Sequence, residues 1–251
     1  SLRRVFRESF SAEDIADLLI SCERHADASE TREFMTSRNL MVAGVRYQGE
    51  VIGYVERDDL TGDQCGDAMQ EFGDDQVIVD TTSLVDTLIR LDRYPRLFVS
   101  VFGGIGGIIT RSDMQKPPMR MWLFGMITLI EMQMTRRIED QLPDERWHEY
   151  LSQGRLRKAE DLVAERARRN QMVQAIDCLQ FSDKCQIIAR CEPLRTATRF
   201  ESRRQVEETA KRIERLRNNL AHAQDIVSTD WYAMVELATY VDDLVADPES
   251  D

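Results

Sequence analysis

The chain has 251 residues, of which 42% are hydrophobic, and it carries a formal net charge of −12 at pH 7. This length and apolar content allow one large or two ordinary domains with hydrophobic cores. The acidic balance argues against a surface that binds nucleic acids broadly, and no apolar run reaches the roughly 18–20 residues that cross a membrane.

The cysteines and the charge distribution narrow the class further. Five cysteines are scattered and odd in number, without the paired spacing of a zinc site, so we expect free thiols, a reducing cytoplasmic compartment and no metal. The N-terminal stretch lacks the apolar core of a signal peptide. Net charge is −8 over 1–135, +4 over 136–224 and −8 over 225–251. A mildly basic block in an acidic chain permits a local anion site.

The first part of the chain mixes helical and strand patterns. Ser11 with two acidic residues after it predicts a helix start, and apolar residues at helical spacing continue from Ile15 to Cys22. Residues 24–38 form an unusual polar insertion in this opening helix. Two β-rich runs, 40–45 and 51–55, flank a glycine-containing turn and predict a hairpin.

The same pattern then returns. A short strand at 77–80, a capped helix at 84–91 and a second hairpin at 97–110 follow one another. The segments 53–59 and 107–113 align at a separation of 54 residues. An internal repeat of this size predicts two copies of one α+β unit, at about 8–62 and 76–118 within a first domain of residues 1–118.

This repeat resembles the CBS (cystathionine beta-synthase) domain, which normally occurs as a tandem pair. The resemblance is carried by the strand–helix–hairpin order and by the ending of glycine, two apolar residues and Thr-x-x-Asp. In that family the pair binds adenosine nucleotides, with the threonine on phosphate and the aspartate on the ribose. The resemblance implies nucleotide contacts by Thr110, Asp113 and Asp59, with AMP, ADP or ATP as a regulatory ligand.

The first copy departs from the family pattern. Glu56 replaces the threonine, and a carboxylate beside phosphate repels it, so this site is expected to be weaker, empty or specific for a nucleoside. A Thr-x-x-Asp sequence after a strand is also a good helix N-cap. A scaffold that binds no ligand therefore stays an alternative for the whole pair.

From Lys116-Pro117-Pro118 onward the pattern is helical. The fold class is thus α+β, with tandem CBS-like repeats followed by an all-α bundle at 119–251 that ends in an acidic tail after Leu244. The expected helices lie at 119–142, from 143 through Tyr150, at 156–180, at 184–190, from Glu201 or Ser202 through the motif described next, and after a cap at 228–230.

The helix from Glu201 contains the sequence Arg217-Asn218-Asn219-Leu220-Ala221-His222. Asparagine is a poor choice inside a helix because its side chain competes for backbone hydrogen bonds. On a helical wheel, Lys211, Arg215, Asn218 and His222 form a polar stripe opposite the core positions, and Arg217 lies at the margin of the core. The motif is either a polar helix end or a functional site.

The helical half resembles the HEPN (higher eukaryotes and prokaryotes nucleotide-binding) superfamily, whose motif is Arg-polar-x-x-x-His late in a helical bundle. The resemblance implies a homodimer and, in many members, a metal-independent RNA endonuclease. Arg217 would hold the scissile phosphate, Asn218 would orient the imidazole or donate to phosphate, and His222 would exchange a proton with the ribose or the leaving oxygen. Lys211 and Arg215 would extend the contact with RNA.

Three functions follow from these resemblances. The first is a nucleotide-regulated ribonuclease that needs no cofactor for catalysis, with the long helix from Met119 as the coupler between the two halves. The second is a non-catalytic protein that dimerises or binds RNA or a partner. The third is a nucleotide sensor that controls a partner enzyme.

Overall fold

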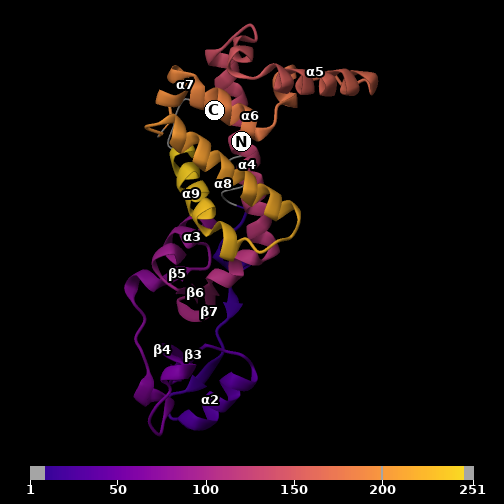
Figure 1. Ribbon diagram of the computed structural model, residues 1–251. Helices are drawn as coiled ribbons and strands as arrows, with labels where there is room; N and C mark the ends of the chain where they lie inside the picture. Colours follow the sequence, from indigo (N-terminus) through magenta and orange to yellow (C-terminus); the bar gives the residue numbers. More distant parts are fainter. Residues whose placement is uncertain (1–8, 199, 246–251) are drawn as a thin grey trace. The chain divides into compact units, whose positions relative to one another are not determined.

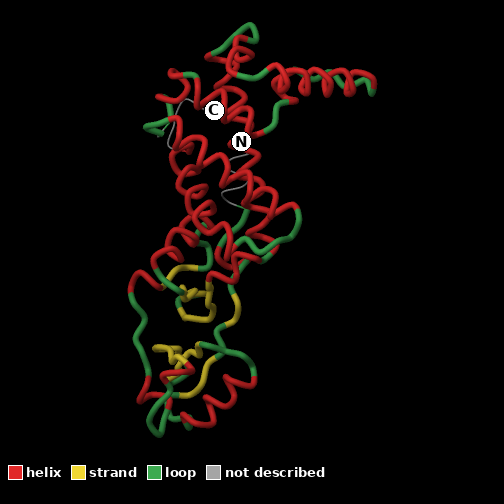
Figure 2. The backbone as a smooth tube through the Cα atoms, in the orientation of Figure 1, coloured by secondary structure: helices red, strands yellow, loops and turns green. Residues whose placement is uncertain are grey.

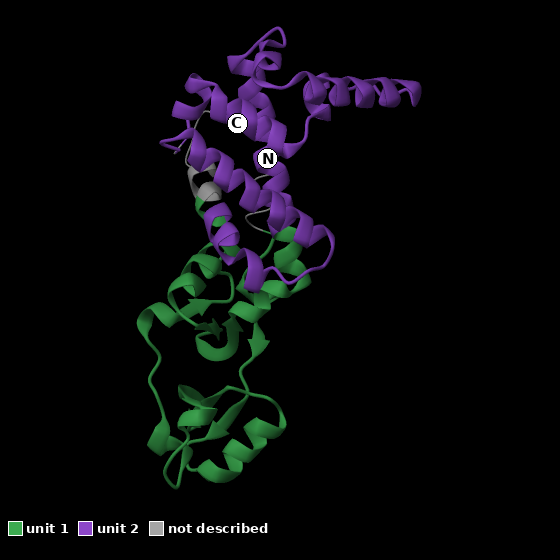
Figure 3. Cartoon of the chain, in the orientation of Figure 1, with its two compact units in different colours: residues 1–122, 238–251 green, residues 123–237 purple. Residues whose placement is uncertain are grey.

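The computed structural model describes residues 9–198 and 200–245. The chain divides into two compact units: unit 1 comprises residues 1–122 and 238–251, and unit 2 comprises residues 123–237 (Figure 3). The predicted junction at 118–119 falls in the first turn of a long helix, and the acidic tail beyond residue 245 lies outside the described residues.

The strands of unit 1 form a four-stranded sheet in the order β1-β7-β6-β5 and a three-stranded sheet in the order β2-β3-β4 (Figure 2). The strands are β1 Asp17–Leu18, β2 Ser21–Glu23, β3 Val42–Tyr47, β4 Glu50–Glu56, β5 Val77–Val79, β6 Arg96–Val101 and β7 Gly104–Thr110. The α-helices among them are α2 Ala28–Ser37 and α3 Leu84–Arg93, and the 3₁₀-helices are η1 Ala12–Asp14, η2 Arg57–Asp59, η3 Cys65–Ala68, η4 Asp74–Gln76 and η5 Arg111–Gln115.

Unit 1 is an internal duplication. In the first copy β2 runs parallel to β3 and β3 pairs antiparallel with β4; in the second copy β5, β6 and β7 repeat this pattern. Each hairpin carries one register shift, at Val45/Arg46 and at Val99/Ser100, so the two irregularities are also 54 residues apart. The hairpins and the capped helix after Ser83 were predicted and are confirmed.

The opening helix expected from Ile15 to Cys22 is wrong. A helical turn does start at the expected place, and the Asp14 carboxylate accepts the Ser11 amide at 2.7 Å. After one 3₁₀ turn, however, the chain forms β1 and β2, which pair with β7 and β3. Strand pairing with distant residues overrides the helical spacing, and it leaves Leu18 84% exposed.

The prediction of a polar insertion at residues 24–38 is also wrong. This segment contains α2, which is the first repeat's counterpart of α3. The Asp27 side chain caps α2 by accepting the Glu30 amide, and the buried face of the helix consists of Ala28, Thr31 and Met35. Because polar residues cover the rest of its surface, the apolar pattern of this helix was too sparse to indicate a helix of the repeat.

The two repeats meet in an aromatic cluster. The ring centroids of Tyr54 on β4 and Phe98 on β6 lie 4.8 Å apart. Phe72, which belongs to the linker between η2 and β5, stacks on Tyr54 at a centroid distance of 5.8 Å. The Tyr54 hydroxyl donates to the side chain of Gln70, and the backbones of these two residues exchange hydrogen bonds. The linker therefore packs on the repeat interface.

The rest of the described chain is helical. The elements are α4 Pro117–Gln141, η6 Arg146–Tyr150, α5 Gln153–Arg168, η7 Ala175–Cys178, α6 Phe181–Arg190, α7 Glu192–Thr196, α8 Arg203–Ala221 and α9 Val227–Val245 (Figure 1). The helix expected at 156–180 is wrong at both ends: Gly154 lies inside α5, and α5 ends at Arg168. The last helix is capped by Asp225, which accepts the amides of Val227 and Ser228.

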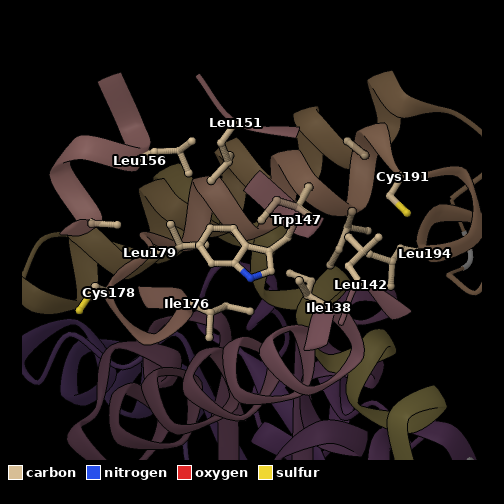
Figure 4. Packing of buried hydrophobic residues seen from close by; sticks show 14 of the residues in the cluster. Ile138, Leu142, Trp147, Leu151, Leu156, Ile176, Cys178, Leu179, Cys191 and Leu194 are labelled. Atoms are coloured by element: carbon tan, nitrogen blue, oxygen red, sulfur yellow. The ribbon is translucent and has the colours of Figure 1, made fainter. Parts of the chain in front are cut away.

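The core of unit 2 centres on Trp147 of η6. The labelled side chains in Figure 4, among them Ile138 of α4 and Leu179, surround its indole, and Leu156 joins them from the start of α5. Within residues 9–198 and 200–245, none of the helices combines the length and apolar character that a membrane span requires.

Candidate functional site

The Thr-x-x-Asp sequence of the second repeat forms a helix cap. Thr110 ends β7, and the Asp113 carboxylate accepts its amide at 2.6 Å and its hydroxyl at 3.0 Å. The other carboxylate oxygen lies 2.8 Å from Lys116 Nζ. Asp113 is only 6% exposed, and both of its oxygens bond to protein donors. The structure thus brings Thr110 and Asp113 together in the capping arrangement that the sequence offered as an alternative.

Lys116 ties this cap to the opening strand. Its ammonium lies 2.6 Å from the Asp17 carboxylate on β1 and donates to the Ile15 carbonyl at 2.7 Å. Burial by itself would lower the pKa of Lys116, but the hydrogen bonds to Asp113 and Asp17 outweigh it and raise that pKa. A nucleotide that approaches Asp113 would have to compete with this lysine.

The first repeat has a different arrangement. Glu56, at the position equivalent to Thr110, forms an ion pair of 2.6 Å with Arg96 on β6 of the other repeat. Arg96 is also the direct pairing neighbour of Thr110 in the β6–β7 ladder, and its guanidinium lies over the ring of Tyr54 at 5.8 Å from the centroid. Arg96 is therefore ion-paired with the first motif position and is the strand neighbour of the second.

Arg96 was missed from the sequence, and Asp59 differs from its counterpart. Arg96 is 16% exposed, and the only signal for it was a charge at the start of a predicted strand, which is uninformative without the partner strand. Asp59 belongs to η2 and is exposed, whereas Asp113 is buried. The two motifs therefore differ. The first has an exposed aspartate and a glutamate in place of the threonine, whereas the second has the threonine and a buried aspartate that is bonded to Lys116.

The helix that carries the Arg-Asn-x-x-x-His motif is α8. It begins at Arg203, close to the expected start at Glu201 or Ser202, and Ser202 caps it by accepting the Gln205 amide at 3.3 Å. Its buried face contains Val206, Thr209, Ala210, Ile213 and Leu216. Lys211, Asn218 and His222 are exposed, and Arg217 is half-buried, as the wheel predicts.

Two polar residues of α8 are bound to α9. Asp230 lies at a kink in α9, where its backbone leaves the helical region, and its side chain is fully buried. Its carboxylate accepts Arg215 Nε and Asn219 Nδ2, both at 2.6 Å. Asn219, one of the two asparagines that break helix propensity, therefore has a structural reason. Arg215 also donates to the Thr229 carbonyl, so its predicted contact with RNA would require release from α9.

Arg217 faces a charged cluster on the opposite side. Its guanidinium lies 4.0 Å from the carboxylate of Glu131 on α4, and that carboxylate pairs at 3.1 Å with Lys184 of α6, which is 5% exposed. Burial raises the pKa of the neighbouring Cys185 thiol, and the charges of Glu214 and Glu131 add to this effect. The Glu131 carboxylate thus pairs with the half-buried Arg217 and also compensates the charge of the buried Lys184 ammonium.

His222 ends the helix. It is the C-cap residue, its amide donates to the Asn218 carbonyl at 3.1 Å, and it is exposed. Asn218 and His222 therefore lie one turn apart at the solvent side of α8. In the part of the chain that the structure describes, His, Cys, Asp and Glu side chains form no group of three or more suited to a metal.

Comparisons with known proteins address the α+β part. None of the family models matches the sequence, and a search of curated proteins finds no match. Solved structures resemble the N-terminal part of the chain. CBSX2 in complex with AMP covers 41% of this chain and 92% of its own, with 21% identity and a TM-score of 0.37. The CBS-pair protein CBSX2 from Arabidopsis thaliana covers 41% of this chain and 90% of its own, with 19% identity and a TM-score of 0.36.

A putative acetoin utilization protein (AcuB) from Vibrio cholerae covers 42% of this chain and 87% of its own, with 17% identity and a TM-score of 0.38. At these identities and scores the comparison is a likeness of fold. The duplicated strand order of unit 1 is established by its own pairing.

Proposed function

We propose that unit 1 is a regulatory module that binds an adenosine nucleotide: AMP, ADP or ATP. The observation that carries the proposal is Arg96, a largely buried cation that forms an ion pair with Glu56 and stands opposite Thr110 in the β6–β7 ladder. Guanidinium groups bind phosphate through paired hydrogen bonds. In the absence of ligand, the Glu56 carboxylate takes the place that a phosphate would occupy.

The exposed Asp59 is the best-placed acceptor for ribose hydroxyls. It follows Glu56 by three residues, as Asp113 follows Thr110, but it is accessible. The class of ligand follows from the resemblance of the repeat motif to the CBS domain. Asp113 can contribute only if Lys116 moves.

Calorimetric titration of the full chain with the three nucleotides tests the proposal. Arg96→Gln removes a charge-assisted contact and should weaken binding about tenfold or more. Glu56→Thr removes the competing carboxylate and should strengthen binding, a change that partial unfolding cannot mimic. Asp59→Asn is an exposed substitution and should weaken binding without altering stability. If none of the three nucleotides produces heat or a thermal shift, the pair is a scaffold.

We further propose that α8 carries a metal-independent RNA endonuclease site formed by Arg217, Asn218 and His222. The supporting observation is that Asn218 and His222 are exposed and one turn apart, beside the half-buried Arg217. His222 can exchange a proton with a ribose hydroxyl, and Arg217 can stabilise charge on the phosphate. The exposed Lys211 can contact the adjoining backbone, with Arg215 as a further contact once it leaves Asp230.

The nuclease test compares RNA cleavage in the presence of a chelator by wild type, His222→Ala and the control His25→Ala, an exposed histidine of unit 1. Cleavage should disappear only in His222→Ala. Equal cleavage by all three would remove the assignment, and no cleavage of any RNA would favour the alternative of a non-catalytic RNA- or partner-binding protein.

The combined function is a nucleotide-regulated ribonuclease that acts as a cytoplasmic homodimer. The helix α4 supports coupling because it contains residues of both units without interruption. Nucleotide addition to the cleavage assay tests the regulation, and sedimentation tests the dimer. A nucleotide effect on a partner enzyme alone would favour the third function.

A further inference from the structure

We propose that the outer part of α5 is a second RNA-binding element that holds the phosphate backbone of an RNA strand. We call residues 157–172 the α5 arm. This inference rests on the proposal that RNA is a partner of the protein. None of the residues in the arm belongs to the RNA contacts proposed for α8.

The α5 arm extends beyond the core that anchors it. Leu156 and Ala159 are buried in the core of unit 2, but from residue 160 to residue 172 every side chain is exposed except the half-buried Val163. The helix is labelled in Figure 1. A helix that buries almost nothing along more than half of its length gains little stability from packing, so its exposed surface requires another explanation.

The exposed surface carries a basic stripe. Lys158, Leu162, Arg166 and Arg169 follow one another at intervals of four, four and three residues, so they share one face of the helix. Lys158 and Arg166 are exposed, and Arg169 lies 2.6 Å from Glu165. With a rise of 1.5 Å per residue, the stripe from Lys158 to Arg169 extends about 16 Å, which is long enough to follow several phosphates.

The charge of the arm favours a polyanion over a protein partner. Residues 157–172 carry five basic and three acidic side chains, within a chain of net charge −12. The exposed large apolar residues of the arm are Leu162 and Met172, ten positions apart, and they do not form the contiguous apolar patch of a protein interface. Guanidinium and ammonium groups in a row match successive phosphates.

The experiment measures binding of a fluorescent single-stranded RNA by anisotropy at several salt concentrations. The stripe variant is Lys158→Gln/Arg166→Gln. The matched control, Arg157→Gln/Arg168→Gln, makes the same change in charge on the same helix but on a different face. Removal of one phosphate-binding side chain should lower the slope of log affinity against log salt by about 0.7. The stripe variant should therefore show a slope smaller by about 1.4 and bind about tenfold or more weakly, while the control stays within about twofold of wild type.

Three results would overturn the inference. These are unchanged affinity and slope in the stripe variant, an equal reduction in both variants, and a shift from dimer to monomer in sedimentation, which would make the arm an interface between copies. Cleavage separates this inference from the nuclease proposal. If the arm is correct and the nuclease site is not, the stripe variant loses affinity while His222→Ala cleaves as wild type. If only the nuclease site is correct, His222→Ala loses cleavage while the stripe variant and its control bind alike.

Discussion

Asp230 holds the polar end of α8 against α9, and Asp230→Ala is the substitution that tests this junction most directly. The carboxylate is fully buried at the kink of α9 and accepts bonds from Arg215 and Asn219. Without it, Asn219 loses its bond of 2.6 Å and retains a longer contact of 3.4 Å with Thr229 Oγ1, whereas Arg215, which is 56% exposed, can return to water. We therefore expect a large decrease in the free energy of unfolding, because the donors of α8 lose their acceptor on α9.

The magnitude follows from the two bonds that join α8 to α9; a third bond, from the hydroxyl of the adjacent Thr229, lies within α9. Hydrogen bonds to a charged group contribute about 1.5–3 kcal/mol each, but the exposed guanidinium of Arg215 is screened by solvent, so its share is discounted. A total of about 3 kcal/mol remains by this reasoning. In a chain of this size, such a loss lowers the melting temperature by roughly 6–12 °C.

Urea unfolding monitored by tryptophan fluorescence measures this loss, because Trp147 and Trp231 both lie in unit 2. The matched control is Asp225→Ala, which removes an exposed capping carboxylate a few residues earlier and should cost about 1 kcal/mol. If Asp230→Ala costs no more than Asp225→Ala, the buried carboxylate does not stabilise the junction and the structural reason for Asn219 fails.

Three further predictions concern buried charges and the repeat interface. The pKa of Lys116 is raised in the folded chain above its ordinary value of 10.5, so the stability from its ion pairs is complete below that pH and lost as pH rises through the folded pKa. Lys116→Met should remove this alkaline loss in urea unfolding measured from about pH 9 to pH 12. Glu131→Leu leaves Lys184 as an uncompensated buried charge and should cost about 3 kcal/mol, whereas adding Lys184→Leu should restore most of it; no recovery in the double variant would contradict the pairing. Gly53→Ala would place a methyl group 2.5 Å from a linker carbonyl oxygen and should lower the unfolding free energy by about 1–3 kcal/mol. In Gly106→Ala the added methyl meets open space, so a similar cost there would refute the steric reason.

The fold was predictable where the signal was local. Both hairpins and the helix after Ser83 followed from alternation, turns and caps in adjacent residues. The strands β1 and β2 were not, because two or three residues form a strand only when β7 and β3 are beside them. The end of α5 at Arg168 was missed because its polar, charged sequence continues without a proline or glycine to mark the boundary.

The sequence indicated which residues belong to the candidate sites, but it did not indicate which side chains contact one another there. The exposure of Asn218 and His222 followed from the helical wheel. The commitment of Asp113 to Lys116 and the pairing of Glu56 with Arg96 depend on how the folded chain brings side chains together, for which one sequence gives no signal. Whether these residues bind nucleotide or cleave RNA stays a prediction.

The ion pair between Glu56 and Arg96 gives the nucleotide proposal a built-in threshold. A carboxylate on the same chain competes for Arg96 at an effective concentration on the order of millimolar, because it is tethered rather than dissolved. A free phosphate group has to exceed that internal competitor before it occupies the site. The module would then bind little nucleotide at low concentrations and respond only at high concentrations, with the threshold set by Glu56. The duplicated strands have the same pairing pattern, while this one residue makes the two motif positions chemically unequal.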